Sequence, residues 1–328
     1  MERGKRGVQT RPPSFFVSMS GYLTRRFFHS IIIIIGISIA VFVISRFTGD
    51  PVSIMVGPDT SQADRATIRK ELGLDRPIPV QYLFFLKGAL QGNFGKSIRY
   101  EESAFRLVLQ RIPATSRLIF FTLLWALVFS IPIGILSAIK RNSFFDVVGM
   151  TFTFLGQSIP SFWLGIMLIM TVGVYFRLLP ISGYGDGDIA HIIMPSLTLG
   201  AFEMASFARI TRSSMLEVLN MDYVQTARAK GLSELIVVVK HSLRNALIPI
   251  VTILGLHIAL LMGGAVITEQ IFAYPGIGWL AVQSIYNRDF PVIQAIVMTV
   301  SIGIVATNFL LDIIYTFIDP RIRYVREK

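Results

Sequence analysis

The sequence contains no cysteine and few charged residues. Among its 328 residues there is no Cys, there are four His, and charged residues make up only 16%. Without cysteine the chain can form no disulfide bond, no thiolate metal site and no cysteine nucleophile. The histidines lack HExxH or any paired spacing, and Gly-x-Ser-x-Gly is absent, so we expect no metal site, no catalytic residues and no bound cofactor.

The sequence is rich in long apolar runs. Hydrophobic residues make up 53% of the chain, and the mean hydropathy of +0.62 exceeds that of an average soluble domain. A membrane-spanning helix needs about 20 apolar residues. The pattern therefore predicts an all-α membrane protein with six transmembrane helices, at 27–47, 118–139, 147–176, 192–208, 245–268 and 290–318. Gly156 and Pro160 are expected to kink the third, and no Ala-x-Ala-like cleavage site follows the first, so we expect that span to be retained.

The basic residues follow this topology. The formal net charge is +11, and Lys and Arg gather in segments that six crossings put on one side: 1–26, 140–141, 209–244 and 321–328. The two short loops of the other side hold only Arg177 and Arg288. The positive-inside rule predicts that both termini lie inside. The positive charge then reflects orientation, and we expect no nucleic-acid partner.

One long polar segment, residues 48–113, lies on the predicted outer side. Within it, Ser61 is a candidate cap for a helix over Gln62–Leu72. Residues 90–97 (LQGNFGKS) are similar to the end of a phosphate-binding P-loop, but the leading glycine is missing and no strand precedes them. We expect no nucleotide site here.

The polar stretch before the fifth span has the features of a short helix. Asp222 is a candidate N-cap, and Gln225 stands three residues on, as in a capping box. Arg228 and Lys230 fall in the last turn, where cations suit the helix dipole, and Gly231 supplies a stop.

Such a helix needs a partner. Two turns are marginal alone in water. By the i, i+3, i+4, i+7 rule one face carries Tyr223, Thr226, Ala227 and Lys230. We expect Ala227 and Gly231 to let the surface of a partner approach closely.

The same stretch carries a family resemblance. Residues 226–232 (TARAKGL) and 241–246 (HSLRNA), followed by Pro249, resemble the cytoplasmic coupling loop of ABC importer permeases of the dipeptide/oligopeptide/nickel branch. Where the generic importer loop begins Glu-Ala-Ala, this chain has Gln225, Thr226 and Ala227, which favours the peptide branch over a sugar permease. Residues 268–278 and 288–294 are similar to the outer loop of that family, and 319–324 to its C-terminal end.

The resemblance implies a fold and a set of partners. The fold would be that of a type I ABC importer permease, with an extracytoplasmic scoop-like subdomain between helices 1 and 2. The implied divisions are a tail at 1–26, helix 1 at 27–47, the subdomain at 48–113, a core at 114–318 containing the coupling loop 220–246, and a tail at 319–328. The implied partners are a second, related permease in a heterodimer, two ATPase subunits that use ATP and Mg, a substrate-binding protein and membrane lipid. The implied location is a bacterial or archaeal cytoplasmic membrane.

The coupling loop would dock on an ATPase. The residues that the resemblance assigns to that contact are Asp222, Tyr223, Thr226, Ala227, Arg228, Ala229, Lys230, Gly231 and Leu232. ATP would be hydrolysed by the partner subunits, so this chain is expected to form the pathway and not to be an enzyme.

Glu203 is the candidate cavity residue. It lies near the middle of the fourth predicted span, where a charge is costly and faces a cavity or a partner helix. We expect His257 to be packed or hydrogen-bonded, and Asp312 to be structural. The favoured function is peptide import, with a nickel- or glutathione-type substrate as an alternative. A secondary transporter that uses Glu203 as an ion relay is the alternative of another class, and ATP dependence against protonophore sensitivity would separate the two.

Overall fold

The computed structural model describes residues 19–47, 61–71 and 73–318. Residues 1–18 of the predicted tail 1–26, the predicted tail 319–328 and the first part of the predicted subdomain lie outside these residues. Within the described part every named element is a helix, and the one β-bridge joins Lys96 to Ser103. The helices are α1 (Met19–Phe47), α3 (Gln62–Glu71), α4 (Ile78–Leu90), α5 (Ala104–Ile139), α6 (Phe144–Ser158), α7 (Ser161–Leu168), η1 (Ile169–Tyr175), η2 (Gly185–Gly187), α8 (Ala190–Leu219), α9 (Asp222–Ala229), α10 (Glu234–Ile236), η3 (Val237–Ser242), α11 (Leu243–Gly264), α12 (Val266–Ile271), α13 (Ile277–Tyr286) and α14 (Phe290–Ile318).

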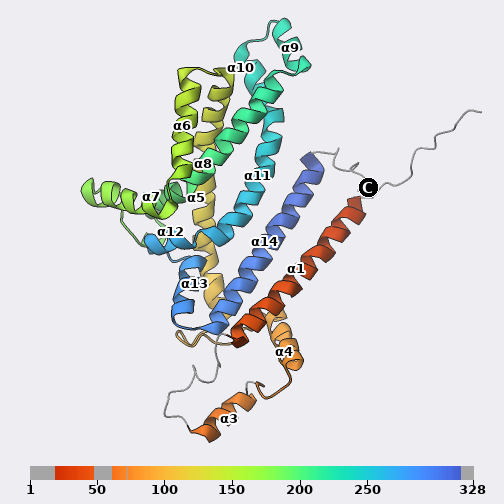
Figure 1. Cartoon of the computed structure of the whole chain (residues 1–328), viewed down its shortest axis with the longest axis vertical. Coiled ribbons are helices and arrows are strands. Elements are labelled where there is room, and N and C mark those ends of the chain that lie inside the picture. The colour runs from red at the N-terminus through yellow and green to blue at the C-terminus, as the bar shows by residue number, and fades with distance from the viewer. Residues whose placement is uncertain (1–18, 48–60, 72, 319–328) are drawn as a thin grey trace, which may run out of the picture.

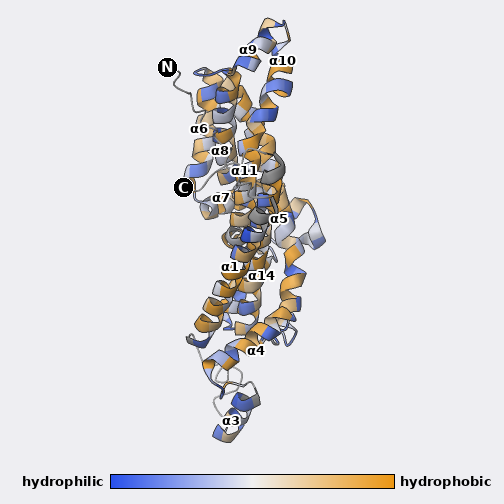
Figure 2. Cartoon of the chain, turned by 90° about the vertical axis from the view of Figure 1, so that its right-hand side faces the viewer, coloured by the Kyte–Doolittle hydropathy of each residue, from blue (hydrophilic) through white to orange (hydrophobic). Residues whose placement is uncertain are grey.

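Four of the described helical stretches are long and apolar enough to cross a membrane. They are Thr24–Arg46 in α1, α5, Glu234–Gly263 ending in α11, and Phe290–Ile314 in α14. The bent pair of α6 with α7–η1 makes a fifth if it counts as one span. Although α8 is 30 residues long, it is not among them. The count of six spans therefore stays a prediction. Figure 2 shows apolar residues along the long helices and more polar ones in α3 and around α9.

The predicted kink in the third span is a full break. Helix α6 ends at Ser158, α7 begins at Ser161, and the two meet at 100° (Figure 1). Pro160 stands between them and has no N–H group with which to continue the helical hydrogen bonds. The sequence predicted the position of the bend, and the structure adds its size.

Helix α5 is the central column of the molecule (Figure 1), and three apolar clusters lie along it. Near its start, Ala104 and Val108 pack with residues of α13 and α14. In its middle, Leu118 and Ala126 belong to the main core with residues of α8, α11 and α12. Near its end, Ala138 joins the cluster around α9. The helix begins at Ala104, so it runs through the boundary predicted at 113/114. The domain division itself stays a prediction.

Helix α1 runs antiparallel to α14 at the edge of the molecule. Arg26 Nε lies 3.2 Å from Asp312 Oδ2 near one end of this pair, and Gln294 donates to Ser45 Oγ (2.7 Å) near the other. The start of α1 and the end of α14 therefore lie together, on the side of the molecule toward α9, whereas α3 and α4 lie at the opposite end (Figure 1). The structural role expected of Asp312 fits its ion pair with Arg26.

The remaining local predictions have different outcomes. Ser61 Oγ accepts the Asp64 N–H (3.1 Å), so the predicted cap at the start of α3 is confirmed. The outer loop expected between the spans 245–268 and 290–318 is largely helical, because α12 and α13 occupy most of it. In the P-loop-like stretch, Ser97 is buried and donates to Asp289 Oδ2 (2.5 Å), which holds this stretch against the start of α14.

Candidate functional site

The segment that connects α8 to α11, residues 220–246, contains the predicted short helix. Helix α9 ends in a Schellman motif: the Gly231 N–H donates to the Arg228 carbonyl (2.9 Å) and the Leu232 N–H to the Ala227 carbonyl (3.4 Å). Gly231 has φ of +77°, in the left-handed region that glycine adopts without a steric cost. The predicted glycine stop is confirmed.

The start of α9 differs from the prediction. Met221 holds the N-cap position with extended backbone and no side-chain cap, and Asp222 is the first helical residue. The Gln225 amide donates instead to the Leu219 carbonyl (3.5 Å). The predicted capping box is therefore wrong, because the helix starts one position earlier than the box requires. Asp222 still lies in the first turn, where its charge complements the helix dipole.

Helix α9 has a hydrophobic core of its own. Val224 and Ala227, three positions apart, are buried against neighbouring helices. The expectation that Ala227 lies open to a partner is wrong: its side chain is 6% exposed and already packed within this chain. The cluster consists of Ala138, Met215, Val218, Leu219, Val224, Ala227, Val237, Val238 and Ala246, from α5, α8, α9, η3 and α11. The segment is thus fastened to three long helices at once.

The outer surface of the segment is part apolar and part basic. Leu235 is 75% exposed, and Ile236 and Val239 are exposed beside it along the chain. Arg228 is held by Glu234, whose carboxylate accepts two hydrogen bonds (2.7 and 3.4 Å). Exposed large apolar side chains rimmed by polar ones are typical of a protein contact. Of the residues predicted for docking, all but the buried Ala227 and the half-buried Arg228 are exposed, namely Asp222, Tyr223, Thr226, Ala229, Lys230, Gly231 and Leu232.

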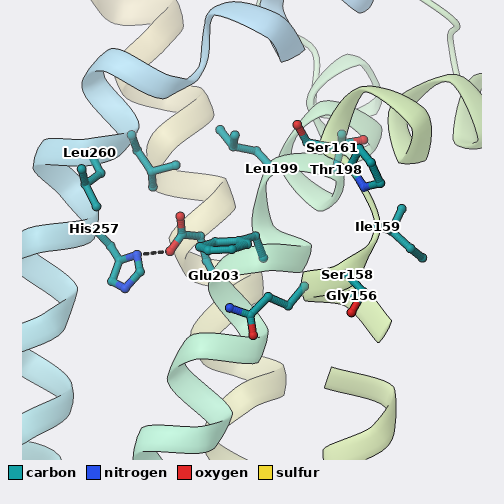
Figure 3. A pocket seen from close by; sticks show the side chains of 13 residues that line it. Gly156, Ser158, Ile159, Ser161, Thr198, Leu199, Glu203, His257 and Leu260 are labelled. Atoms are coloured by element: carbon teal, nitrogen blue, oxygen red, sulfur yellow. Dashed lines mark ion pairs between the residues drawn. The ribbon is translucent and has the colours of Figure 1, made fainter. Parts of the chain in front are cut away.

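A second feature is a cavity of ≈ 520 Å³ at the break between α6 and α7 (Figure 3). Glu203 of α8 lines it and forms a close ion pair with His257 Nδ1 of α11. Both side chains are only 8% exposed. The rest of the lining comes from the end of α6, the start of α7 and apolar residues of α8 and α11: Gly156, Gln157, Ser158, Ile159, Pro160, Ser161, Thr198, Leu199, Phe202, Leu260 and Leu261.

Glu203 therefore satisfies both geometries expected of a carboxylate in a span. It lies against a cavity and pairs with a neighbouring helix. The imidazole of His257 also packs against the tilted ring of Phe207, with ring centroids 5.0 Å apart, and its Nε2 lies 3.4 Å from Ser206 Oγ. Sequence reasoning expected His257 to be packed or hydrogen-bonded but missed its partner, because no local pattern links residues on two different helices.

Two further buried carboxylates were missed. Asp146 of α6 accepts a bidentate pair of hydrogen bonds from Arg212 of α8 (2.8 Å each) and one from the Asn142 N–H (2.9 Å). Glu269 of α12 is fully buried and accepts from Thr115 Oγ1 (2.7 Å) and the Trp279 N–H (2.9 Å). The signal in the sequence was a lone acid beside an apolar run. Each carboxylate fixes one helix against another, so both are structural ties.

The chain matches two family models. The first, "Binding-protein-dependent transport system inner membrane component", covers residues 130–324. The second, "Binding-prot-dependent transport system membrane comp, N-term", covers residues 19–119. Together they include most of the chain, with the α8–α11 segment and the cavity inside the first.

Relatives of similar length support the same assignment. The chain is 44% identical to the oligopeptide transport system permease protein AppB of Bacillus subtilis (strain 168), over 93% of this chain and all of the relative. It is 38% identical to the dipeptide transport system permease protein DppB of Escherichia coli (strain K12), over 93% and 99%. It is 40% identical to the glutathione transport system permease protein GsiC of Salmonella choleraesuis (strain SC-B67), over 93% and 100%.

A solved structure supports the fold. The chain resembles a chain of the inward-facing methionine ABC transporter MetNI with a TM-score of 0.56 at 19% identity, over 65% of this chain and 96% of that one. With the two family matches and the relatives above, this shows that the chain belongs to the family of inner-membrane components of binding-protein-dependent transport systems, the permease subunits of ABC importers.

Proposed function

We propose that this chain forms half of the membrane pathway of an ATP-driven peptide importer. A second, related permease supplies the other half, two ATPase subunits hydrolyse ATP with Mg, and an external binding protein delivers the cargo. Peptide cargo is supported by the relatives, whose names specify oligopeptide, dipeptide and glutathione transport. In this proposal the two ATPase subunits carry out every step of ATP hydrolysis.

The observation that carries the proposal is the attachment of α9. A short helix can pass on movement only if it is rigid and joined to the elements that must move. Its Schellman motif fixes the C-terminal end, and Val224 and Ala227 bury its inner face among α5, α8 and α11. Docking of an ATPase against its outer face would then move α8 and α11 together, and ATP would supply the difference in binding energy between two states.

The same proposal orients the chain. We infer six crossings with both termini and the α8–α11 segment in the cytoplasm. The basic residues at 140–141 and 209–244 support this through the positive-inside rule. Helices α3 and α4 lie at the opposite end of the molecule and would face the binding protein (Figure 1).

The test is Leu235→Glu in the assembled transporter. Leu235 is 75% exposed, so the change should leave the chain folded while placing a charge in the proposed contact. If Leu235 is a central contact worth about 2 kcal/mol, ATPase co-purification and ATP-dependent peptide uptake in liposomes should fall roughly thirtyfold. Leu83→Glu is the matched control for ATPase co-purification, because Leu83 of α4 is similarly exposed (62%) at the end of the molecule far from α9.

A third variant separates contact from folding. Ala227→Glu would bury a charge in the cluster around α9 and should therefore expose the segment to proteases. Leu235→Glu should not. Full ATPase binding and uptake by Leu235→Glu would contradict docking at this surface, and uptake that is abolished by a protonophore but indifferent to ATP would contradict the importer mechanism.

A further inference from the structure

The cavity at the α6–α7 break has one pair of ionisable side chains in an otherwise mostly apolar wall (Figure 3). The only side chain with a formal negative charge in its lining is that of Glu203, and its only possible formal cation is His257, which pairs with it. The aliphatic wall comes from Leu199, Leu260 and Leu261. A ligand that enters this cavity therefore meets one ionisable pair.

His257 lies between two polar side chains. Its Nδ1 forms the close ion pair with Glu203, and its Nε2 lies 3.4 Å from the Ser206 hydroxyl. The Glu203 carboxylate and the His257 ring both line the cavity.

The end of α6 adds carbonyl acceptors to the cavity. Residues 156–159 lie at the C-terminal end of α6, whose last carbonyls have no partner further along the helix. Pro160, which follows them, has no N–H to offer. The start of α7 at Ser161 lines the same cavity and carries the opposite partial charge, so the formal negative charge of the lining comes from Glu203 alone.

A purely structural role explains this pair poorly. Two buried ionisable groups bring a desolvation cost, and apolar residues of similar size often hold helices together as well or better. A metal ion is also a poor fit, because no group of three metal-ligating side chains occurs in the part of the chain that the structure describes. A primary ammonium group, by contrast, needs one carboxylate and a few carbonyl acceptors.

We propose that this cavity is a cargo subsite in which Glu203 binds a primary ammonium group of the transported peptide. The inference rests on the proposed peptide-import function and adds to it the chemistry by which the permease itself recognises cargo. The ammonium can be the amino terminus of the peptide or a lysine side chain. His257 acts as a positioning residue, because its Nδ1 holds the carboxylate at the edge of the cavity.

The test measures weak peptide binding to the purified permease–ATPase assembly without its binding protein, by saturation-transfer NMR. Three probes are compared: Ala-Lys-Ala, Ala-norleucine-Ala, and N-acetyl-Ala-norleucine-Ala, which has no ammonium. Loss of one charge-assisted hydrogen bond predicts about tenfold weaker binding of ammonium-bearing peptides to Glu203→Gln. The acetylated peptide should bind equally to both proteins. Glu203→Asp should keep most of the preference, and Glu217→Gln, an exposed glutamate on the same helix, should change nothing.

The outcomes are distinct. A loss confined to Ala-Lys-Ala assigns the ammonium to the lysine side chain, and a loss for both unacetylated peptides assigns it to the amino terminus. Equal loss for all three, or for none, would overturn the subsite. If Glu203→Gln does not assemble, the wild type alone decides, because equal affinity for all three probes overturns the proposal. Absent peptide uptake by the complete wild-type transporter would contradict the importer function instead.

Discussion

Gly276→Ala should destabilise the chain through a single contact. Gly276 has φ of −91° and ψ of −171°, an extended backbone that alanine adopts without strain. A methyl group there would nevertheless meet the carboxylate of Glu269, since the three nearest atoms are Oε1 (2.1 Å), Cδ (2.2 Å) and Oε2 (2.4 Å), all of that side chain. The carboxylate would have to move by about 1.5 Å to reach ordinary contact distance.

The cost follows from what that movement breaks. Glu269 is fully buried and accepts hydrogen bonds from the buried Thr115 Oγ1 (2.7 Å) and from the Trp279 N–H (2.9 Å). At about 1.5 kcal/mol for each bond to a charged group, Gly276→Ala should cost about 3 kcal/mol. Denaturant titration of the purified chain in detergent micelles measures this free energy of unfolding.

A double-mutant cycle isolates the cause. In a Glu269→Ala background the obstructing carboxylate is gone, so Gly276→Ala should cost less than about 1 kcal/mol there. The coupling free energy is then about 2 kcal/mol. Equal costs of Gly276→Ala in both backgrounds would refute the reasoning, because the backbone or another neighbour would then be responsible.

Two further predictions concern the α8–α11 segment and the orientation of the chain. Gly231→Ala should lower the free energy of unfolding by about 1 kcal/mol through its left-handed φ alone, because no atom lies within 4 Å of the added methyl group. Gly231→Asn should cost less. An unchanged thermal midpoint for Gly231→Ala would contradict the predicted strain. The chain has no native cysteine, so a single introduced cysteine can be labelled selectively. Ser233→Cys should react with an impermeant maleimide only from the cytoplasmic side, and Gly185→Cys only from the outer side. The opposite pattern would reverse the proposed orientation.

Features that depend on neighbouring residues were the easiest to predict from the sequence. Gly231 stops α9 and Ser61 caps α3 because both effects act over three or four residues. The break at Pro160 was predictable for the same reason, since proline removes a donor wherever it stands. Its 100° angle was not, because the packing of α7 against α8 and α12 sets the direction.

Long-range features could not be predicted. The sequence showed which residues of α9 share a face but not which face this chain would bury, and so Ala227 was assigned to the wrong side. The partner of Glu203 lies 54 positions away on another helix, where periodicity carries no information. The start of α5 was placed too late because Arg106, Arg111 and Arg117 interrupt the apolar run without interrupting the helix.

Because the end of α8 belongs to the hydrophobic cluster around α9, a movement of that cluster would tilt α8 along its length. Glu203 lies about 24 Å along α8 from Leu219, the last residue of that helix, at roughly 1.5 Å per residue. Helix movements of about 1–2 Å are typical of switching proteins, and over this length they correspond to a tilt of only about 2–5°. Such a displacement is enough to separate a carboxylate and an imidazole that are in contact. A small rotation at the α9 cluster would therefore open or close the contact between Glu203 and His257 at the edge of the cavity.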